Sequence, residues 1–145
     1  MKLTHTLLAA ALALGVGTTA LAQDQATLYK RLGGYDALAA VTDDFLGRLA
    51  TDPKMGRFFV GHSTNSVGRI RGDVINFLCV ATKGPCSYTG RDMKTSHTGL
   101  KITDEDWDSS VKALTATLAK FKVPATETNE VLTLVSTLKG DIAGR

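Results

Sequence analysis

Four stretches of this chain repeat apolar residues every three or four positions, and this periodicity constrains the fold more than any other feature. Such spacing places apolar side chains along one face of an α-helix. The stretches are residues 38–49, 70–81, 107–121 and 131–142. No segment sustains the alternation of apolar and polar residues that a half-buried strand requires. The sequence therefore predicts an all-α fold.

The first 22 residues have the pattern of a secretory signal peptide. Lys2 precedes an apolar run at 7–16, and small residues lead to Ala22, where we predict cleavage. The run is shorter than the roughly 18–20 uncharged residues that a transmembrane helix needs, and no later stretch reaches that length. No cysteine stands at the cleavage site to take a lipid. We therefore expect a periplasmic or secreted protein without a membrane span.

Residues 23–145 are enough for one domain with a sizeable core and too few for two. The formal net charge of the whole chain is +3, and removing Lys2 leaves +2. Lysines and arginines are interleaved with acidic residues and form no stripe, which argues against nucleic-acid binding. We expect a single monomeric domain.

The two cysteines, Cys79 and Cys86, allow a disulfide in a chain that leaves the reducing cytosol. Such a bridge would pin the beginning of the segment that follows Gly84-Pro85. Two buried free thiols are the alternative, because cysteine also behaves as a small apolar core residue. Two cysteines alone do not supply a four-ligand metal cluster.

Few side chains are arranged for catalysis or metal binding. The sequence has no paired-acid signature, phosphate loop, nucleophile motif or pair of histidines at chelating spacing. It therefore lacks the catalytic residues of a hydrolase and the ligands of a zinc enzyme. Residues 84–101 form a long, weakly periodic segment that carries His97, and loops beyond about 12–15 residues usually serve a function. A lone histidine is usually structural. It also suits haem, because the porphyrin supplies the other four in-plane bonds to iron.

Several motifs follow one another in the order and spacing of the group I truncated haemoglobins, and the resemblance covers nearly all of residues 23–145. They are LYKRLGG at 28–34, VTDDF at 41–45, Asp52-Pro53 leading to Phe58-Phe59, Gly84-Pro85, YTGRDM at 88–93, His97 and GLKIT at 99–103. The resemblance implies a two-over-two helical sandwich around haem b, with His97 as the proximal iron ligand. It also implies an extended loop with a short helix before His97. Lys83 stands where the family usually has another glycine.

The resemblance further implies which residues surround the haem. Those that we expect to line the cofactor are Phe45, Leu46, Phe59, Ile70, Val74, Phe77, Met93, His97, Ile102 and Trp107. Each flanking aromatic, methionine or aliphatic residue can instead be ordinary core, since apolar stripes pack helices with or without a cofactor. Arg69, Arg71 and Lys94 are candidate partners of the haem propionates, with solvated surface charge as the alternative.

The distal side departs from the family pattern. Group I members commonly place a tyrosine, often assisted by a glutamine on the facing helix, where this chain has Leu46, Ile70 and Val74. A hydrogen bond to a polarised ligand contributes ~1–3 kcal/mol, so its loss predicts fast oxygen release. His62 is the one polar candidate nearby, and we expect it to be an exposed loop residue. If it folded inward, its imidazole would ligate iron or donate to the iron's ligand.

Three functions stay open at this point. The first is reversible binding of O2, CO or NO, for transport, sensing or scavenging outside the cytoplasm. The second is haem redox chemistry, such as nitric-oxide dioxygenation or weak peroxidase activity, with an electron-donor reductase as partner. The third is a haem-free helical adaptor that has kept the fold alone.

Overall fold

A computed structural model describes residues 26–145, so the expected signal peptide, residues 1–22, lies outside the described residues. Every regular element in this part is helical: α2 (Leu28–Arg31), α3 (Gly34–Thr51), the 3-10 turn η1 (Met55–Phe58), α4 (Thr64–Ala81), α5 (Met93–His97), α6 (Asp104–Lys120), α7 (Ala125–Ser136) and α8 (Lys139–Ile142). Over these residues the all-α prediction is confirmed. None of the described helices is long and apolar enough to cross a membrane.

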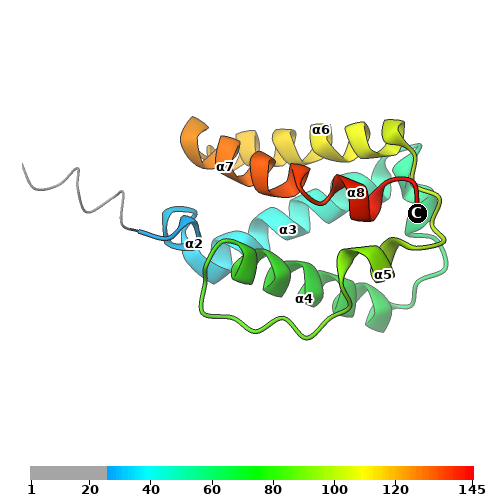
Figure 1. The fold of residues 1–145 in the computed structure, drawn as a ribbon, viewed down its shortest axis with the longest axis horizontal. Helices are drawn as coiled ribbons and strands as arrows, with labels where there is room; N and C mark the ends of the chain where they lie inside the picture. The colour runs from blue at the N-terminus through cyan, green and yellow to red at the C-terminus, as the bar shows by residue number, and fades with distance from the viewer. Residues whose placement is uncertain (1–25) are drawn as a thin grey trace, which may run out of the picture.

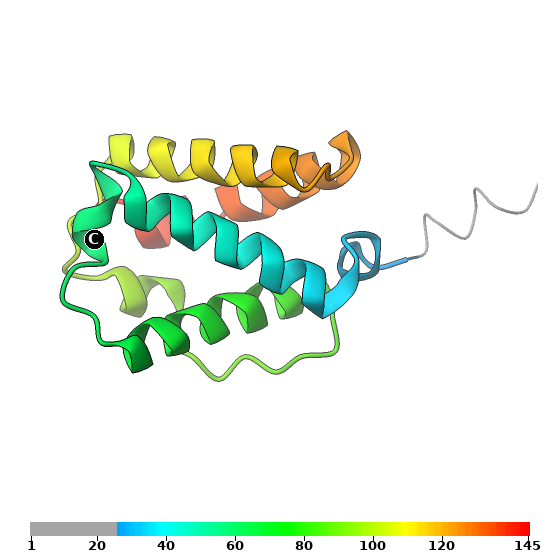
Figure 2. The same ribbon diagram turned by 180° about the vertical axis from the view of Figure 1, so that it is seen from behind.

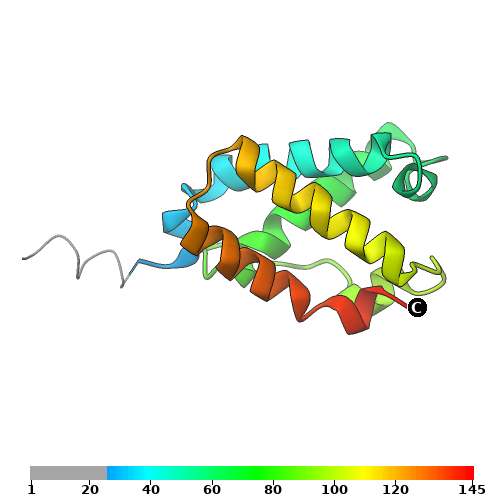
Figure 3. The same cartoon turned by 90° about the horizontal axis from the view of Figure 1, so that it is seen from above.

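Two antiparallel helix pairs make up the body of the molecule, α3 with α4 and α6 with α7 (Figures 1 and 2). α3 also packs on α6 and so joins the two pairs. The short helices α5 and α8 pack against each other at the end of the molecule opposite α2 (Figure 3). This is the two-over-two arrangement that the sequence predicts.

The predicted apolar stripes form two clusters. Leu38, Ile75 and Cys79 meet between α3 and α4. A second cluster joins α6 to α7 and receives Phe45 from α3; its buried members are Leu114, Leu118 and Val131. Burying side chains of this size stabilises the fold by about 1.5–3 kcal/mol each, so these clusters, more than helix propensity, hold the pairs together.

The helix that follows Thr103 begins where the sequence indicates. Thr103 Oγ1 accepts from the Asp106 amide at 3.2 Å, and the Asp106 carboxylate accepts from the Thr103 amide at 2.9 Å. These two bonds form a capping box, which satisfies donors that the first turn leaves free. The capping box therefore fixes the residue at which α6 begins and the direction in which the chain enters the helix.

The stripe at 131–142 is two helices, and its prediction as one was wrong. α7 ends at Ser136, and α8 begins at Lys139. The Thr137 and Leu138 amides donate to the carbonyls three residues back, Leu134 and Val135, at 3.3 and 2.9 Å. This tighter turn interrupts the α-helical bonding pattern, and apolar spacing does not reveal it. The break lets α8 turn onto α5.

The turn after α4 fixes the beginning of the long segment. Cys79 and Cys86 form a disulfide, which decides between the two alternatives for these cysteines. Lys83 has a φ of 64°, so a lysine here adopts the left-handed conformation that glycine adopts more readily. At Gly84 a Cβ would lie 2.5 Å from Cys79 Sγ and 2.6 Å from Tyr29 Cδ2. Only glycine lets the chain pass this close to the bridge.

Candidate functional site

His97 is the last residue of α5, and a backbone acceptor orients its half-buried ring. Its Nδ1 lies 2.7 Å from the Met93 carbonyl oxygen. A carbonyl oxygen only accepts, so Nδ1 carries a proton, and in the neutral imidazole the lone pair is then on Nε2. Metal-ligating histidines are typically held in this way, through the ring nitrogen that does not bind the metal. The imidazole is therefore oriented to ligate through Nε2.

The segment before α5 is held against α4 by an aromatic contact. Tyr88 packs edge-on against Phe77, with ring centroids 5.5 Å apart, and its hydroxyl donates to the Arg91 carbonyl. Burial of this ring raises the pKa of Tyr88. Asp92 then caps α5 by accepting from the Thr95 amide at 2.6 Å, and this bond lowers the pKa of the Asp92 carboxyl. The helix that carries the histidine thus has a defined beginning.

The segment after His97 pairs with the last residues of the chain. The Lys101 amide donates to the Arg145 carbonyl at 2.9 Å, and the Gly144 amide donates to the Ile102 carbonyl at 2.8 Å. Together with the packing of α5 on α8, these bonds hold α5 from its C-terminal side. His97 consequently sits between two anchored segments.

The predicted distal residues come from the packed helices α3 and α4. Leu46, Ile70 and Val74 are half-buried, and none of them carries a hydrogen-bond donor. Thr42 lies one helical turn before Leu46, on the same face of α3. Its Oγ1 is the one buried side-chain oxygen or nitrogen in residues 26–145 without a hydrogen-bond partner. His62 lies exposed in the loop before α4, as expected.

The remaining predicted pocket residues differ in burial. Ile102 and Trp107, before and in the first turn of α6, are only 6% and 7% exposed. Phe45 packs on the cluster between α6 and α7, which is a core role. The half-buried members are Phe59, Phe77 and Met93. Half-burial leaves part of these three apolar side chains available to a further apolar partner.

The cations predicted at the rim of the site have different surroundings. The Arg71 guanidinium binds the Asp43 carboxylate through two hydrogen bonds, which raises the pKa of Arg71 and lowers that of Asp43. Arg71 therefore joins α4 to α3 through Asp43. Arg69 donates to the Ser66 hydroxyl at 3.3 Å, and Lys94 is exposed on α5. All three stay predictions as propionate partners.

The donor set fits a haem group better than a bare metal ion. A bare ion in a protein site takes several side-chain ligands, and residues 26–145 hold no group of three or more histidine, cysteine, aspartate or glutamate residues that could bind one. Haem needs one axial imidazole and apolar surroundings. His97 would provide the former, and half-buried residues of α3, α4, α5 and the Phe58-Phe59 corner would provide the latter.

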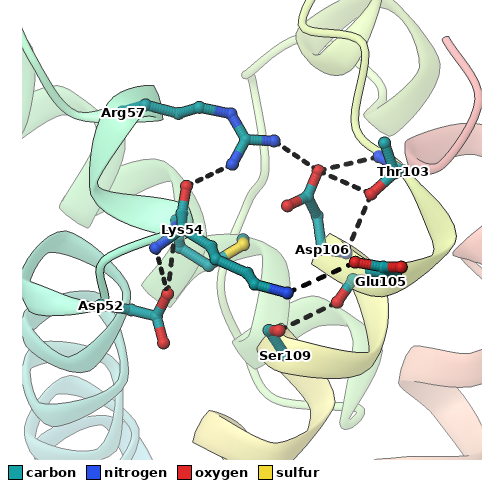
Figure 4. A network of polar contacts seen from close by, with 8 residues as sticks. Asp52, Lys54, Arg57, Thr103, Glu105, Asp106 and Ser109 are labelled. Carbon is teal, nitrogen blue, oxygen red and sulfur yellow. Dashed lines mark hydrogen bonds and ion pairs between the residues drawn. The ribbon is translucent and has the colours of Figure 1, made fainter.

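The sequence did not indicate one polar link at the site. Arg57, in η1, donates to the Asp106 carboxylate of α6 at 2.6 Å (Figure 4). The Thr103-Asp106 spacing predicts a cap and so identifies Asp106 as a positioned carboxylate. Nothing in the sequence indicates its partner 49 residues away.

Comparisons with known proteins agree with this geometry. Residues 27–143 match the family model described as bacterial-like globin. A group 1 truncated hemoglobin of Mycolicibacterium paratuberculosis is 32% identical over 120 residues, which cover 83% of this chain and 86% of that protein. One from Nostoc commune is 34% identical over 119 residues, covering 82% and 98%.

Solved structures show the same relationship. The truncated hemoglobin of Tetrahymena pyriformis in its Fe(III) form has a TM-score of 0.75 at 26% identity, over 83% of this chain and 100% of that one. The 2/2 hemoglobin of Synechococcus, in the cyanomet state and with covalently attached heme, has a TM-score of 0.75 at 27% identity over the same shares. The chain thus belongs to the bacterial-like globin family and, within it, to the group 1 truncated haemoglobins.

Proposed function

We propose that this protein binds haem b through His97 Nε2 and takes up a diatomic ligand, O2, CO or NO, outside the cytoplasm. The observation that carries the proposal is the bond between His97 Nδ1 and the Met93 carbonyl. It places a proton on Nδ1, so that the neutral ring has its lone pair on Nε2, on a helix anchored at both ends. When bound, haem supplies the iron that takes up the gas.

His97 acts as a fixed axial base in this proposal. The Met93 carbonyl accepts the Nδ1 proton, which selects the tautomer and increases the electron donation of Nε2. The ring as a whole is half-buried. Phe59 and Phe77 provide flat apolar surfaces suited to a porphyrin.

The distal wall determines how strongly the ligand is held. Leu46, Ile70 and Val74 exclude water and offer no hydrogen bond, so packing and the bond to iron hold the ligand. Such a wall favours carriage or scavenging with rapid release over high-affinity storage.

Export is the second part of the proposal, and it rests on residues 1–22. The Cys79–Cys86 disulfide supports it, because structural disulfides persist mainly in oxidising compartments outside the cytosol. We expect the mature protein to begin after Ala22, and N-terminal sequencing of protein recovered from the periplasm or medium tests this.

The visible absorption spectrum of the purified protein tests the proposal. We expect a Soret band in the wild type, its loss or shift in His97→Ala, and an unchanged band in His62→Ala, which removes an exposed histidine from the same chain. A wild type that takes up no haem would favour the haem-free adaptor. Rapid consumption of nitric oxide or peroxide with an added reductant would favour the redox function.

A further inference from the structure

We infer that Arg57 and Asp106 form a positioning pair that anchors the Phe58-Phe59 corner to the beginning of α6 and thereby sets how long haem stays bound. The inference rests on the proposed haem binding for its second half. Neither residue is among the expected cofactor contacts, and both act through neighbouring apolar side chains. The pair links η1 to α6 across the end of the molecule that holds the C-terminus (Figures 1 and 4).

Asp106 is a buried carboxylate with three donors around one oxygen. It is 3% exposed, and its Oδ2 accepts from the Thr103 amide at 2.9 Å, the Thr103 hydroxyl at 3.0 Å and Arg57 at 2.6 Å. The Thr103 amide, with help from Arg57, lowers the pKa of Asp106. A carboxylate this buried requires a compensating cation, and Arg57 is the one paired with it.

The Arg57 guanidinium makes three contacts at once. One nitrogen donates to Asp106, and another donates to the Lys54 carbonyl within the same turn. Its central carbon lies 4.2 Å from the centroid of the Phe58 ring, within cation–π range. A planar guanidinium stacks flat on a ring while its nitrogens donate in fixed directions, whereas a lysine ammonium has donors but no planar group. The side chain therefore fixes the position of Phe58, and with it the next residue, Phe59.

The beginning of η1 is held independently. The Asp52 carboxylate accepts from the Lys54 amide at 2.8 Å and from the Met55 amide at 2.9 Å. Met55 is buried beneath the turn. Asp52 thus holds the first half of the turn through hydrogen bonds. Arg57 holds the second half, next to Phe58 and Phe59.

The pair joins two walls of the predicted pocket. On one side stands Phe59, expected on the porphyrin face. On the other stand Ile102 and Trp107, the expected proximal residues that flank the α6 cap. If the link is broken, the corner can move away from α6, and a cofactor held between the two walls loses contact on one side.

A neighbouring ion pair provides a matched control. Lys54 and Glu105 join the same two segments at 3.3 Å, but their side chains are 62% and 82% exposed. Exposed pairs of this kind contribute little to stability because water and salt screen them. Figure 4 shows the two pairs side by side, so Glu105→Gln removes a charge close to Asp106 without breaking a buried contact.

The test compares Asp106→Asn, Arg57→Met, their double mutant and Glu105→Gln. The asparagine keeps an oxygen for the Thr103 amide, so the cap of α6 is retained while the charge is removed. Arg57→Lys is a milder variant that keeps the charge and loses the planar group. Helical circular dichroism and the fluorescence of Trp107, the single tryptophan, report whether each variant is folded.

Two readouts separate anchoring from haem retention. Amide hydrogen exchange of residues 55–60 reports on the corner, where the Phe59 amide donates to the Gly56 carbonyl. Transfer of haem to excess apomyoglobin reports on retention. We expect Asp106→Asn and Arg57→Met to raise both rates about five- to tenfold. We expect Arg57→Lys to lie between them and wild type, and Glu105→Gln to match wild type. The double mutant should add little to either single change, because the two residues act as one unit.

Three results would overturn all or part of the inference. Unchanged exchange of residues 55–60 in Asp106→Asn and Arg57→Met would show that the pair does not anchor the corner. Faster exchange with unchanged haem transfer would show a structural link without a role in retention. A wild type that binds no haem would overturn the proposed function and the retention half together, and the exchange rates would still decide the anchoring half.

Discussion

The segment that carries His97 is held by directed bonds, whereas the α3–α4 wall that carries Leu46, Ile70 and Val74 is apolar. Around His97 the chain uses a helix cap, a backbone acceptor for the ring and pairing with the C-terminal residues. The opposing predicted wall presents half-buried aliphatic side chains without a donor. Hydrogen bonds have a direction, so they can hold one ligating atom in place, as iron ligation requires. Apolar packing has no direction and fixes only the shape of the surface. Under the proposed function, the His97 side would bind the cofactor and the apolar side would select the gas.

Polar residues on other faces of α3 nevertheless tie the apolar wall to α4 and α6. Asp43 binds Arg71 of α4, and Asp44 accepts from Thr117 and Lys120 of α6. These contacts lower the pKa of both aspartates. α3 therefore directs polar side chains toward its neighbours and leaves a neighbouring face apolar. Changes to each side separately test whether this division holds.

The largest expected effect concerns the disulfide, which anchors the His97 segment to α4. Replacing Cys79 and Cys86 together with alanine should lower the free energy of unfolding by about 2–3 kcal/mol, because the reduced unfolded chain regains loop entropy. Urea denaturation of the variant and of oxidised and reduced wild type measures this. Equal stability of the two wild-type forms, or two reactive thiols in unfolded, unreduced protein, would contradict it.

The next effect concerns the distal wall. Leu46→Tyr adds a donor and should slow oxygen dissociation about 10- to 100-fold, corresponding to a bond of ~1–3 kcal/mol, while CO dissociation changes little because bound CO is less polar. Leu46→Phe, which adds the ring without the hydroxyl, is the matched control for stopped-flow ligand replacement. If the wild type already releases oxygen as slowly as the tyrosine variant, a donor is present, and Thr42→Val and His62→Ala would identify it.

The smallest effect is an acid dependence of the contacts that hold α3. Because its Lys120, Arg48 and Thr117 partners lower the pKa of Asp44 in the folded state, its stabilisation is present above the unfolded pKa of about 3.8. It is lost as the pH falls toward the folded pKa. Urea midpoints at about pH 7 and about pH 3 should therefore differ less in Asp44→Asn than in wild type. An equal acid-induced loss in both proteins would assign the sensitivity to other carboxylates.

The sequence predicted features that depend on neighbours along the chain. The apolar stripes predicted the principal helices, and Thr103 and Asp106 predicted the beginning of α6. Each of these follows from hydrogen bonds or packing within a few residues. Weak periodicity indicated a long irregular segment before His97, and the family resemblance implied the short helix within it. The resemblance placed His97 and the pocket residues, and their contact with haem stays a prediction.

The sequence did not predict features that depend on distant partners. The Arg57–Asp106 pair joins residues 49 positions apart, and the Arg71–Asp43 pair joins residues 28 positions apart. Charged residues on helix faces usually end in solvent, so composition offers no signal for such pairs. The break at Thr137 was missed because the apolar spacing continues across it, while the backbone forms a tighter turn there.

The most direct test of the account is chemical rescue at the proximal position. His97→Gly removes the imidazole and leaves space for a free one. We expect the variant to lose the ferrous iron–histidine stretch in resonance Raman spectra and to recover a corresponding band when imidazole is added. His62→Gly should keep the wild-type band without imidazole. An unchanged iron–histidine band in His97→Gly would contradict the account, because another residue would then ligate the iron.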